Sequence, residues 1–144
     1  MTVLDVSSAA LAEASARLAA EASRVTWLEA NVLDAALPAS AYDVWHDRAV
    51  FHFLTEAAHR ERYVEQVRAS VRLGGHVVVA TFAPDGPSKC SGLPVARYAP
   101  QELHGQFGSD FQLVDSVRQE HRTPAGAIQP FVYCLCRVAR HRSG

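Results

Sequence analysis

The residues that could perform chemistry begin at the end of a strand-like segment, YDVWHDR, at residues 42–48. His46 can accept a proton or bind a metal, Asp47 is a hydrogen-bond acceptor, and Arg48 carries a permanent positive charge. His52 follows about one helical turn later. In open α/β sheets, ligands bind beyond the carboxyl ends of the strands. We therefore expect the functional site at this end of the segment.

Further polar residues follow two later segments. Cys90 lies in the long stretch of residues 83–98, which contains Pro and Gly at turn positions, and Glu120 and His121 end the segment of residues 111–121. Imidazoles, carboxylates and thiolates are the groups that bind zinc and similar divalent cations. We therefore predict a site for zinc or another divalent metal, with the ligands His46, His52, Cys90 and His121.

Such a metal site would favour hydrolysis. A zinc ion with an open coordination position lowers the pKa of its bound water to about 7 and so supplies hydroxide at neutral pH. Arg48 could then stabilise the oxyanion that develops on an activated ester, phosphoester or phosphotriester. The predicted catalytic residues are Asp47, Arg48 and Glu120. Neither HExxH nor CxxC is present, so the prediction depends on the convergence of ligand types and not on their spacing.

The same residues also have structural interpretations. The polar triplet of residues 46–48 can line a substrate pocket, and His52 can be a packed or surface histidine. Cys134 and Cys136 alternate onto one face of the last strand-like segment. This spacing favours core thiols over a metal site with two thiolates.

Hydrophobic periodicity places these residues on an alternating series of elements. The predicted strands are residues 2–6, 24–31, 42–48, 76–82, 111–121 and 130–140. Helical patterns follow a Ser7 or Ser8 cap, with an apolar stripe over residues 11–22, and recur over residues 49–73 and 99–107. The pattern of residues 49–73 can be broken near Thr55, where Thr55 and Glu56 offer a second helix start. Gly74 and Gly75 are expected to end the second helix. The alternation predicts an α/β fold with a mostly parallel sheet and a C-terminal antiparallel hairpin.

Composition limits the class of protein. The chain has 144 residues, of which 49% are hydrophobic and 20% charged, with a formal net charge of −1. These values predict a single folded domain over residues 1–144 and give no reason to expect a nucleic-acid partner. We find neither an apolar run of about 20 residues nor a signal peptide. Three cysteines, an odd number, predict free thiols and a cytoplasmic location.

The order of these segments resembles the class I S-adenosylmethionine-dependent methyltransferases, from their second strand to their seventh. The stretches that carry the resemblance are TVLD, ANVLDAALP, YDVWHDRAVFHFL, VRLGGHVVVATF and FVYCLCRV. The resemblance implies a Rossmann-like sheet and S-adenosylmethionine as cofactor. It also implies that Asp5 holds the ribose hydroxyls and that Asp34 meets the adenine amino group.

The sequence departs from this family at its start. Family members begin with a strand and a GxGxG loop, whose backbone amides at the start of a helix cradle the cofactor's methionine moiety. No residues before Met1 form them here, so we expect a truncated sheet without its first strand and with poor cofactor binding. Exposed sheet edges invite pairing with another chain. They predict a homodimer through those edges or through an exchanged element.

Three functions remain open on these observations. We favour metal-dependent hydrolysis, because methylation conflicts with the missing glycine-rich loop. The first alternative is methylation of a small molecule with S-adenosylmethionine. The second is a catalytically inactive remnant that dimerises. Bound metal would support hydrolysis, and binding of S-adenosylmethionine would support methylation. The absence of both ligands would favour the inactive remnant.

Overall fold

The computed structural model describes residues 1–141. The chain divides into two compact units, Met1–Leu37 (unit 1) and Pro38–Gly144 (unit 2). The predicted single domain over residues 1–144 stays a prediction. None of the helices in the described part of the chain is long and apolar enough to span a membrane.

Unit 1 is a strand–helix–strand unit. Its elements, in chain order, are β1 (Thr2–Asp5), α1 (Ser8–Leu18), the 3-10 helix η1 (Ala19–Arg24) and β2 (Thr26–Glu29). The Ser7 hydroxyl accepts a hydrogen bond from the Ala10 amide at 3.2 Å, which confirms Ser7 as the helix cap. β1 and β2 pair in parallel, with Asp5 opposite Glu29. Both strands therefore end at the same edge.

Unit 2 contains the larger sheet. Its elements are β3 (Tyr42–Arg48), η2 (Phe51–Phe53), α2 (Ala57–Ser70), β4 (Val71–Phe82), β5 (Lys89–Cys90), β6 (Leu93–Pro94), α3 (Pro100–Phe107), β7 (Phe111–Arg122) and β8 (Ile128–Val138). The strand order is β3-β4-β8-β7, and β5 and β6 form a separate small ladder. β3 and β4 are parallel, whereas β8 is antiparallel to both of its neighbours. The sheet is therefore mixed, and not mostly parallel as predicted, because β8 lies beside β4.

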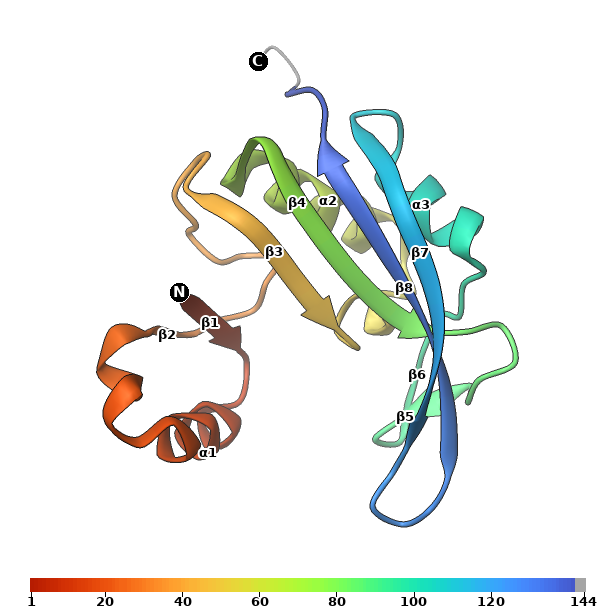
Figure 1. The fold of residues 1–144 in the computed structure, drawn as a ribbon, viewed down its shortest axis with the longest axis horizontal. Coiled ribbons are helices and arrows are strands. Elements are labelled where there is room, and N and C mark those ends of the chain that lie inside the picture. The colour runs from red at the N-terminus through yellow and green to blue at the C-terminus, as the bar shows by residue number, and fades with distance from the viewer. Residues whose placement is uncertain (142–144) are drawn as a thin grey trace. The chain divides into compact units, whose positions relative to one another are not determined.

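Helices α2 and α3 lie on one face of this sheet (Figure 1). Alternate residues of the central strands point toward them and are buried, as period-2 side-chain alternation requires. Val77 and Val79 of β4 are each 1% exposed, and Cys134 and Cys136 of β8 are 1% and 2% exposed. The prediction that these two cysteines are core thiols is confirmed.

The predicted break near Thr55 in the helical pattern of residues 49–73 is confirmed, because residues 54–56 separate two helices, but the predicted end at Gly74 and Gly75 is wrong. Residues 51–53 form the short helix η2, and α2 occupies only Ala57–Ser70. Gly74 and Gly75 do not end the helix but lie inside β4, where the pairing with β3 is irregular. Gly74 has φ +79°, a conformation that glycine adopts without strain. The glycines therefore allow a local irregularity in the strand.

Candidate functional site

Asp47 anchors the turn that follows β3. Its carboxylate accepts hydrogen bonds from the backbone amides of Val50 at 2.9 Å and Phe51 at 3.0 Å. The Tyr63 hydroxyl, from α2, donates a third bond at 2.5 Å. Burial raises the pKa of Asp47 above its ordinary value, although these donors oppose the shift. Asp47 therefore positions η2, and its predicted catalytic role stays a prediction.

Arg48 points to the opposite face of the sheet, because successive strand residues alternate. Its Nε donates a hydrogen bond to the Tyr133 hydroxyl on β8 at 3.0 Å. The guanidinium carbon also lies 4.8 Å from the centre of the Phe131 ring, within cation–π distance. His46 shares this face with Arg48 and is exposed. The predicted polar triplet is therefore divided between the two faces of the sheet.

An apolar cluster lies at the carboxyl ends of β3 and β4. Its buried members are Ala80, Phe82, Val95 and Phe131, and Ala49, Phe53, Cys90 and Tyr133 pack against them. The rings of Phe82 and Phe131 meet edge to face with centroids 5.0 Å apart. We call these eight residues the aromatic cluster. The sequence prediction missed its ring residues, although the alternation of Phe131 and Tyr133 on one face of β8 is a visible signal.

The backbone is strained where this cluster begins. Ala49, directly after β3, has φ +69°, a conformation that residues with a Cβ rarely adopt. Its amide donates a hydrogen bond to the Ala80 carbonyl at 2.9 Å, which holds the strained residue against β4. Strained residues of this kind concentrate at functional sites, where the surrounding structure maintains them.

His52 is the most unusual residue of this edge. Its side chain is completely buried, and its ring lies 4.7 Å from the Phe53 ring and 4.8 Å from the Phe82 ring, measured between centroids. Neither ring nitrogen has a hydrogen-bond partner. Burial lowers the pKa of His52 to about 4, so the imidazole is neutral at pH 7.

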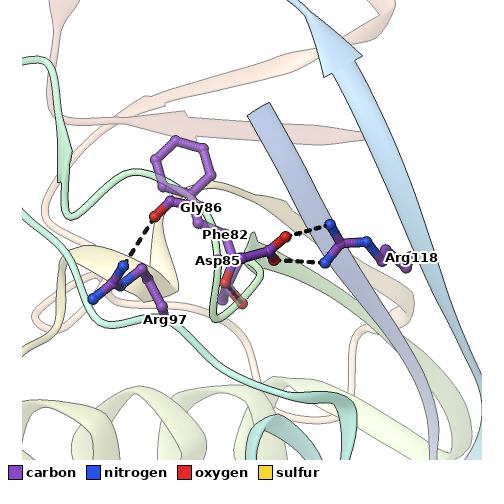
Figure 2. A network of polar contacts seen from close by, with 6 residues as sticks. Phe82, Asp85, Gly86, Arg97 and Arg118 are labelled. Carbon is purple, nitrogen blue, oxygen red and sulfur yellow. Dashed lines mark hydrogen bonds and ion pairs between the residues drawn. The ribbon is translucent and has the colours of Figure 1, made fainter. Parts of the chain in front are cut away.

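A long loop, residues 83–98, runs over this edge. It begins where the Ala83 amide donates to the Pro130 carbonyl at 2.9 Å. Figure 2 shows two further contacts of the loop. Asp85 forms a bidentate ion pair with Arg118 at 2.6 and 2.7 Å, and the Arg97 guanidinium donates a hydrogen bond to the Gly86 carbonyl at 3.0 Å. The loop is therefore fastened near both of its ends.

The remaining predicted residues lie on the loop and on the β7–β8 hairpin. Cys90 is half-buried on β5 and packs against the aromatic cluster. Glu120 is exposed on β7, opposite Pro130. The His121 ring lies 6.3 Å from the Phe131 ring, measured between centroids. Cys90 therefore makes an apolar contact with the cluster, and His121 makes a ring contact with it.

The predicted metal centre is not assembled. Among residues 1–141, no group of three or more His, Cys, Asp or Glu side chains is arranged to hold a metal ion. His52 is enclosed by the rings of Phe53 and Phe82, and His46 lies on the exposed face of β3. The predicted set His46, His52, Cys90 and His121 therefore does not form one coordination site, because His46 faces solvent whereas the His52 ring packs against phenylalanine rings.

Unit 1 carries the two predicted cofactor residues at one edge. Asp5 ends β1, and its Oδ1 accepts a hydrogen bond from the Ser7 amide at 2.8 Å. Asp34 follows β2 in a tight turn closed by the Asn31 carbonyl, which accepts from the amides of Asp34 at 3.0 Å and Ala35 at 2.9 Å. Both carboxylates thus follow the carboxyl ends of parallel strands, where α/β sheets bind ligands.

Comparison with known protein families gives one match. A family model described as a methyltransferase domain matches residues 1–77, which is more than half of the chain. The matched range includes β1, β2, β3, the first part of β4 and the polar triplet of residues 46–48. No curated protein matches the chain in sequence.

Solved structures have the same fold. A S-adenosylmethionine-dependent methyltransferase from Methanosarcina mazei matches 96% of this chain and 81% of its own at 13% identity, with a TM-score of 0.71. The N-methyltransferase NodS from Bradyrhizobium japonicum matches 96% and 73% at 17% identity, with a TM-score of 0.72. The 1,6-didemethyltoxoflavin-N1-methyltransferase from Burkholderia thailandensis, with bound S-adenosylhomocysteine, matches 96% and 61% at 19% identity, with a TM-score of 0.71.

These findings overturn the favoured prediction of metal-dependent hydrolysis. The matched family transfers methyl groups, and the described residues do not assemble the predicted ligand set. They support the first alternative, methylation with S-adenosylmethionine. The four-stranded mixed sheet and the antiparallel C-terminal strands agree with that fold. The chain belongs to the class I S-adenosylmethionine-dependent methyltransferase domain family.

Proposed function

We propose that this protein methylates a small aromatic molecule with S-adenosylmethionine. The observation that carries the proposal is the aromatic cluster at the carboxyl edge of unit 2, with Arg48 hydrogen-bonded to its member Tyr133, in a chain of this family. Phe82 and Phe131 are only 1% and 4% exposed here, so the 83–98 loop has to move before a flat acceptor can stack on these rings, which then exclude water from it. The Arg48 guanidinium and the Tyr133 hydroxyl offer polar contacts that fix its orientation.

The residues of unit 1 fit the nucleoside part of the cofactor. S-adenosylmethionine, when bound, supplies a methyl group attached to a positively charged sulfur. The ribose hydroxyls and the adenine amino group are hydrogen-bond donors, and Asp5 and Asp34 are carboxylate acceptors at one edge of the β1–β2 pair. The Ser7 amide holds the Asp5 carboxylate in place. We propose that Asp5 binds the ribose and that Asp34 contacts the adenine.

The similar solved structures support a small acceptor. The Burkholderia protein is described with bound 1,6-didemethyltoxoflavin, and a NodS structure is described in complex with S-adenosylhomocysteine. At 19% identity or less, these likenesses establish the fold, and the acceptor of this chain is proposed from the cluster itself.

Calorimetry with S-adenosylmethionine and S-adenosylhomocysteine tests the cofactor part. Asp5→Asn should weaken binding about ten- to hundredfold, because a hydrogen bond to a charged group contributes about 1.5–3 kcal/mol. Glu13→Gln is the matched control on α1, since Glu13 is exposed and pairs only locally with Arg17. Absence of cofactor binding, or equal binding by wild type and Asp5→Asn, would contradict the proposal.

Transfer of a labelled methyl group to a panel of phenols, anilines and nitrogen heterocycles tests the acceptor part. We expect labelled product from aromatic acceptors and little from aliphatic alcohols and amines of similar size. Equal labelling of both classes would show that the aromatic cluster does not select the acceptor.

We also propose that the protein forms a homodimer through its sheet edges. Within residues 1–141, β3 and β7 each have a single neighbouring strand in the four-stranded sheet. Unpaired strand edges are templates for pairing with another chain. Sedimentation equilibrium should give twice the 15.7 kDa mass of the chain. A concentration-independent monomer would contradict this part.

A further inference from the structure

The imidazole of His52 lacks the hydrogen bonds that a buried polar group normally makes. Most buried polar side-chain atoms in native proteins have a partner, and a buried atom without one destabilises the fold. His52 is 0% exposed, and both Nδ1 and Nε2 lack a partner. A leucine or phenylalanine would fill this apolar environment without that cost. The histidine therefore requires a reason outside folding.

The surroundings of His52 indicate what kind of molecule could supply the missing bonds. Phe53 and Phe82 contact its ring, and both belong to the aromatic cluster. Burial keeps the imidazole neutral at pH 7, so one ring nitrogen is a donor and the other is an acceptor. A matching ligand is flat and apolar, with an N–H or O–H group at its edge.

The 83–98 loop packs against the aromatic cluster through Cys90 and Val95. The Ala96 amide donates a hydrogen bond to the His52 carbonyl at 2.7 Å, so the loop crosses this residue directly. The loop is tied near its ends by the Asp85–Arg118 and Arg97–Gly86 contacts (Figure 2). Between these ties lie only the two-residue strands β5 and β6. This middle part carries Cys90, and Val95 follows it, so its displacement would open the aromatic cluster in which the His52 ring lies and leave the ties intact.

We infer that His52 binds the methyl acceptor, and that the acceptor is an aromatic small molecule bearing an N–H or O–H group. The inference rests on the proposed methyltransferase function and adds the residue that recognises the acceptor heteroatom. One ring nitrogen hydrogen-bonds that heteroatom after the 83–98 loop moves, and the rings of the aromatic cluster hold the flat body of the molecule.

The first test compares phenol with toluene as probes, in the presence of saturating S-adenosylhomocysteine. The two molecules share a ring and differ in the hydroxyl group. Wild-type protein should bind phenol about tenfold more tightly than toluene, and phenol should shift the imidazole nitrogen resonances of His52 in NMR spectra. Equal affinities, or unchanged His52 resonances when phenol is bound, would overturn the inference. This measurement needs no substitution in the protein.

The second test uses His52→Phe, which keeps a ring and removes both nitrogens. This variant should bind phenol and toluene with about equal affinity, while its affinities for toluene and S-adenosylhomocysteine stay as in wild type. The melting temperature should stay equal or rise, because two unpaired polar atoms are removed. A clear fall in melting temperature with an unchanged phenol preference would show a structural histidine. His52→Gln, which retains a donor and an acceptor, should recover part of the preference.

His59→Gln is the matched control. His59 is exposed on α2, and its Nδ1 lies 4.0 Å from a carboxylate oxygen of Glu56. It should retain the wild-type preference for phenol over toluene.

The two proposals can fail separately. A wild-type protein that does not bind S-adenosylhomocysteine contradicts the proposed function. A protein that binds it but does not distinguish phenol from toluene contradicts only the role of His52.

Discussion

Arg48 on β3 reaches Tyr133 on β8 across the whole width of β4, with 3.0 Å between Nε and the hydroxyl oxygen. The residue between them in register is Ala80, which pairs with Arg48 on one side and with Tyr133 on the other. Paired residues share one face of a sheet, so only a small side chain at position 80 leaves room for this contact. The polar border of the aromatic cluster therefore depends on an alanine.

Ala80→Leu should damage both the contact and the packing. Ala80 is 0% exposed, so a larger side chain overpacks its site, which typically costs about 1–3 kcal/mol of unfolding free energy. Urea denaturation measures this loss. Val44→Leu is the control, because Val44 is 57% exposed on β3. An Ala80→Leu protein as stable as wild type would show that the register leaves more space than the structure indicates.

Asp47→Asn should destabilise the protein by about 1–3 kcal/mol at pH 7, the typical cost of an unsatisfied buried group. The two carboxylate oxygens accept the amides of Val50 and Phe51 separately, and an asparagine presents a single acceptor oxygen. One backbone amide therefore loses its partner in either amide orientation. Asp43→Asn, at an exposed position of β3, is the control. Equal unfolding free energies for wild type and Asp47→Asn would contradict the anchoring role.

The same variant tests the titration of Asp47. Burial raises its pKa in the folded state above the ordinary value of 3.8. The folded state thus holds this proton more tightly, so the stability contributed by the group is fullest below pH 3.8 and falls as the pH rises toward the folded-state pKa. The stability difference between wild type and Asp47→Asn should therefore narrow as the pH rises from 3.8. A difference that widens over this range would mean a lowered pKa.

Gly75→Ala should destabilise the protein strongly. A Cβ at this position would lie 2.7 Å from Val71 Cγ1 and 2.9 Å from the carbonyl oxygens of Arg72 and Asp43. Backbone oxygens cannot move aside cheaply, so a loss of about 1–3 kcal/mol is expected in urea denaturation. Gly105→Ala is the control: nothing lies within 4 Å of its Cβ position in α3, and helix propensity favours alanine by up to about 1 kcal/mol. Equal changes in unfolding free energy for Gly75→Ala and Gly105→Ala would contradict the close packing around Gly75.

The three cysteines should react with a thiol reagent at two different rates. Cys90 is half-buried, whereas Cys134 and Cys136 are buried beneath α2 and α3, with their sulfurs 3.4 Å apart. The folded protein should therefore expose one reactive thiol, and the unfolded protein all three. Cys90→Ser should abolish the fast reaction. Rapid modification of all three thiols in the folded protein would show that the core of unit 2 opens readily.

Much of the architecture follows from local sequence. The Ser7 cap, the strand that ends at Arg48 and the shared face of Cys134 and Cys136 are set by residues close together in the chain, through capping and period-2 alternation. The order of these segments also indicates the methyltransferase family. Asp5 ends β1 for the same reason, because it directly follows a short apolar run, whereas Asp34 lies in the turn after β2.

The tertiary structure decided the character of the site. The sequence brings His46, Asp47 and His52 close together in the chain, but strand alternation places the first two on opposite faces, and aromatic rings enclose the third. Whether a histidine binds a metal, faces solvent or lies unpartnered among rings depends on residues far away in sequence, here Phe82. Sequence by itself determined the family and indicated the sheet edge at which we expect chemistry. Only long-range packing determined that this edge is aromatic rather than metal-binding.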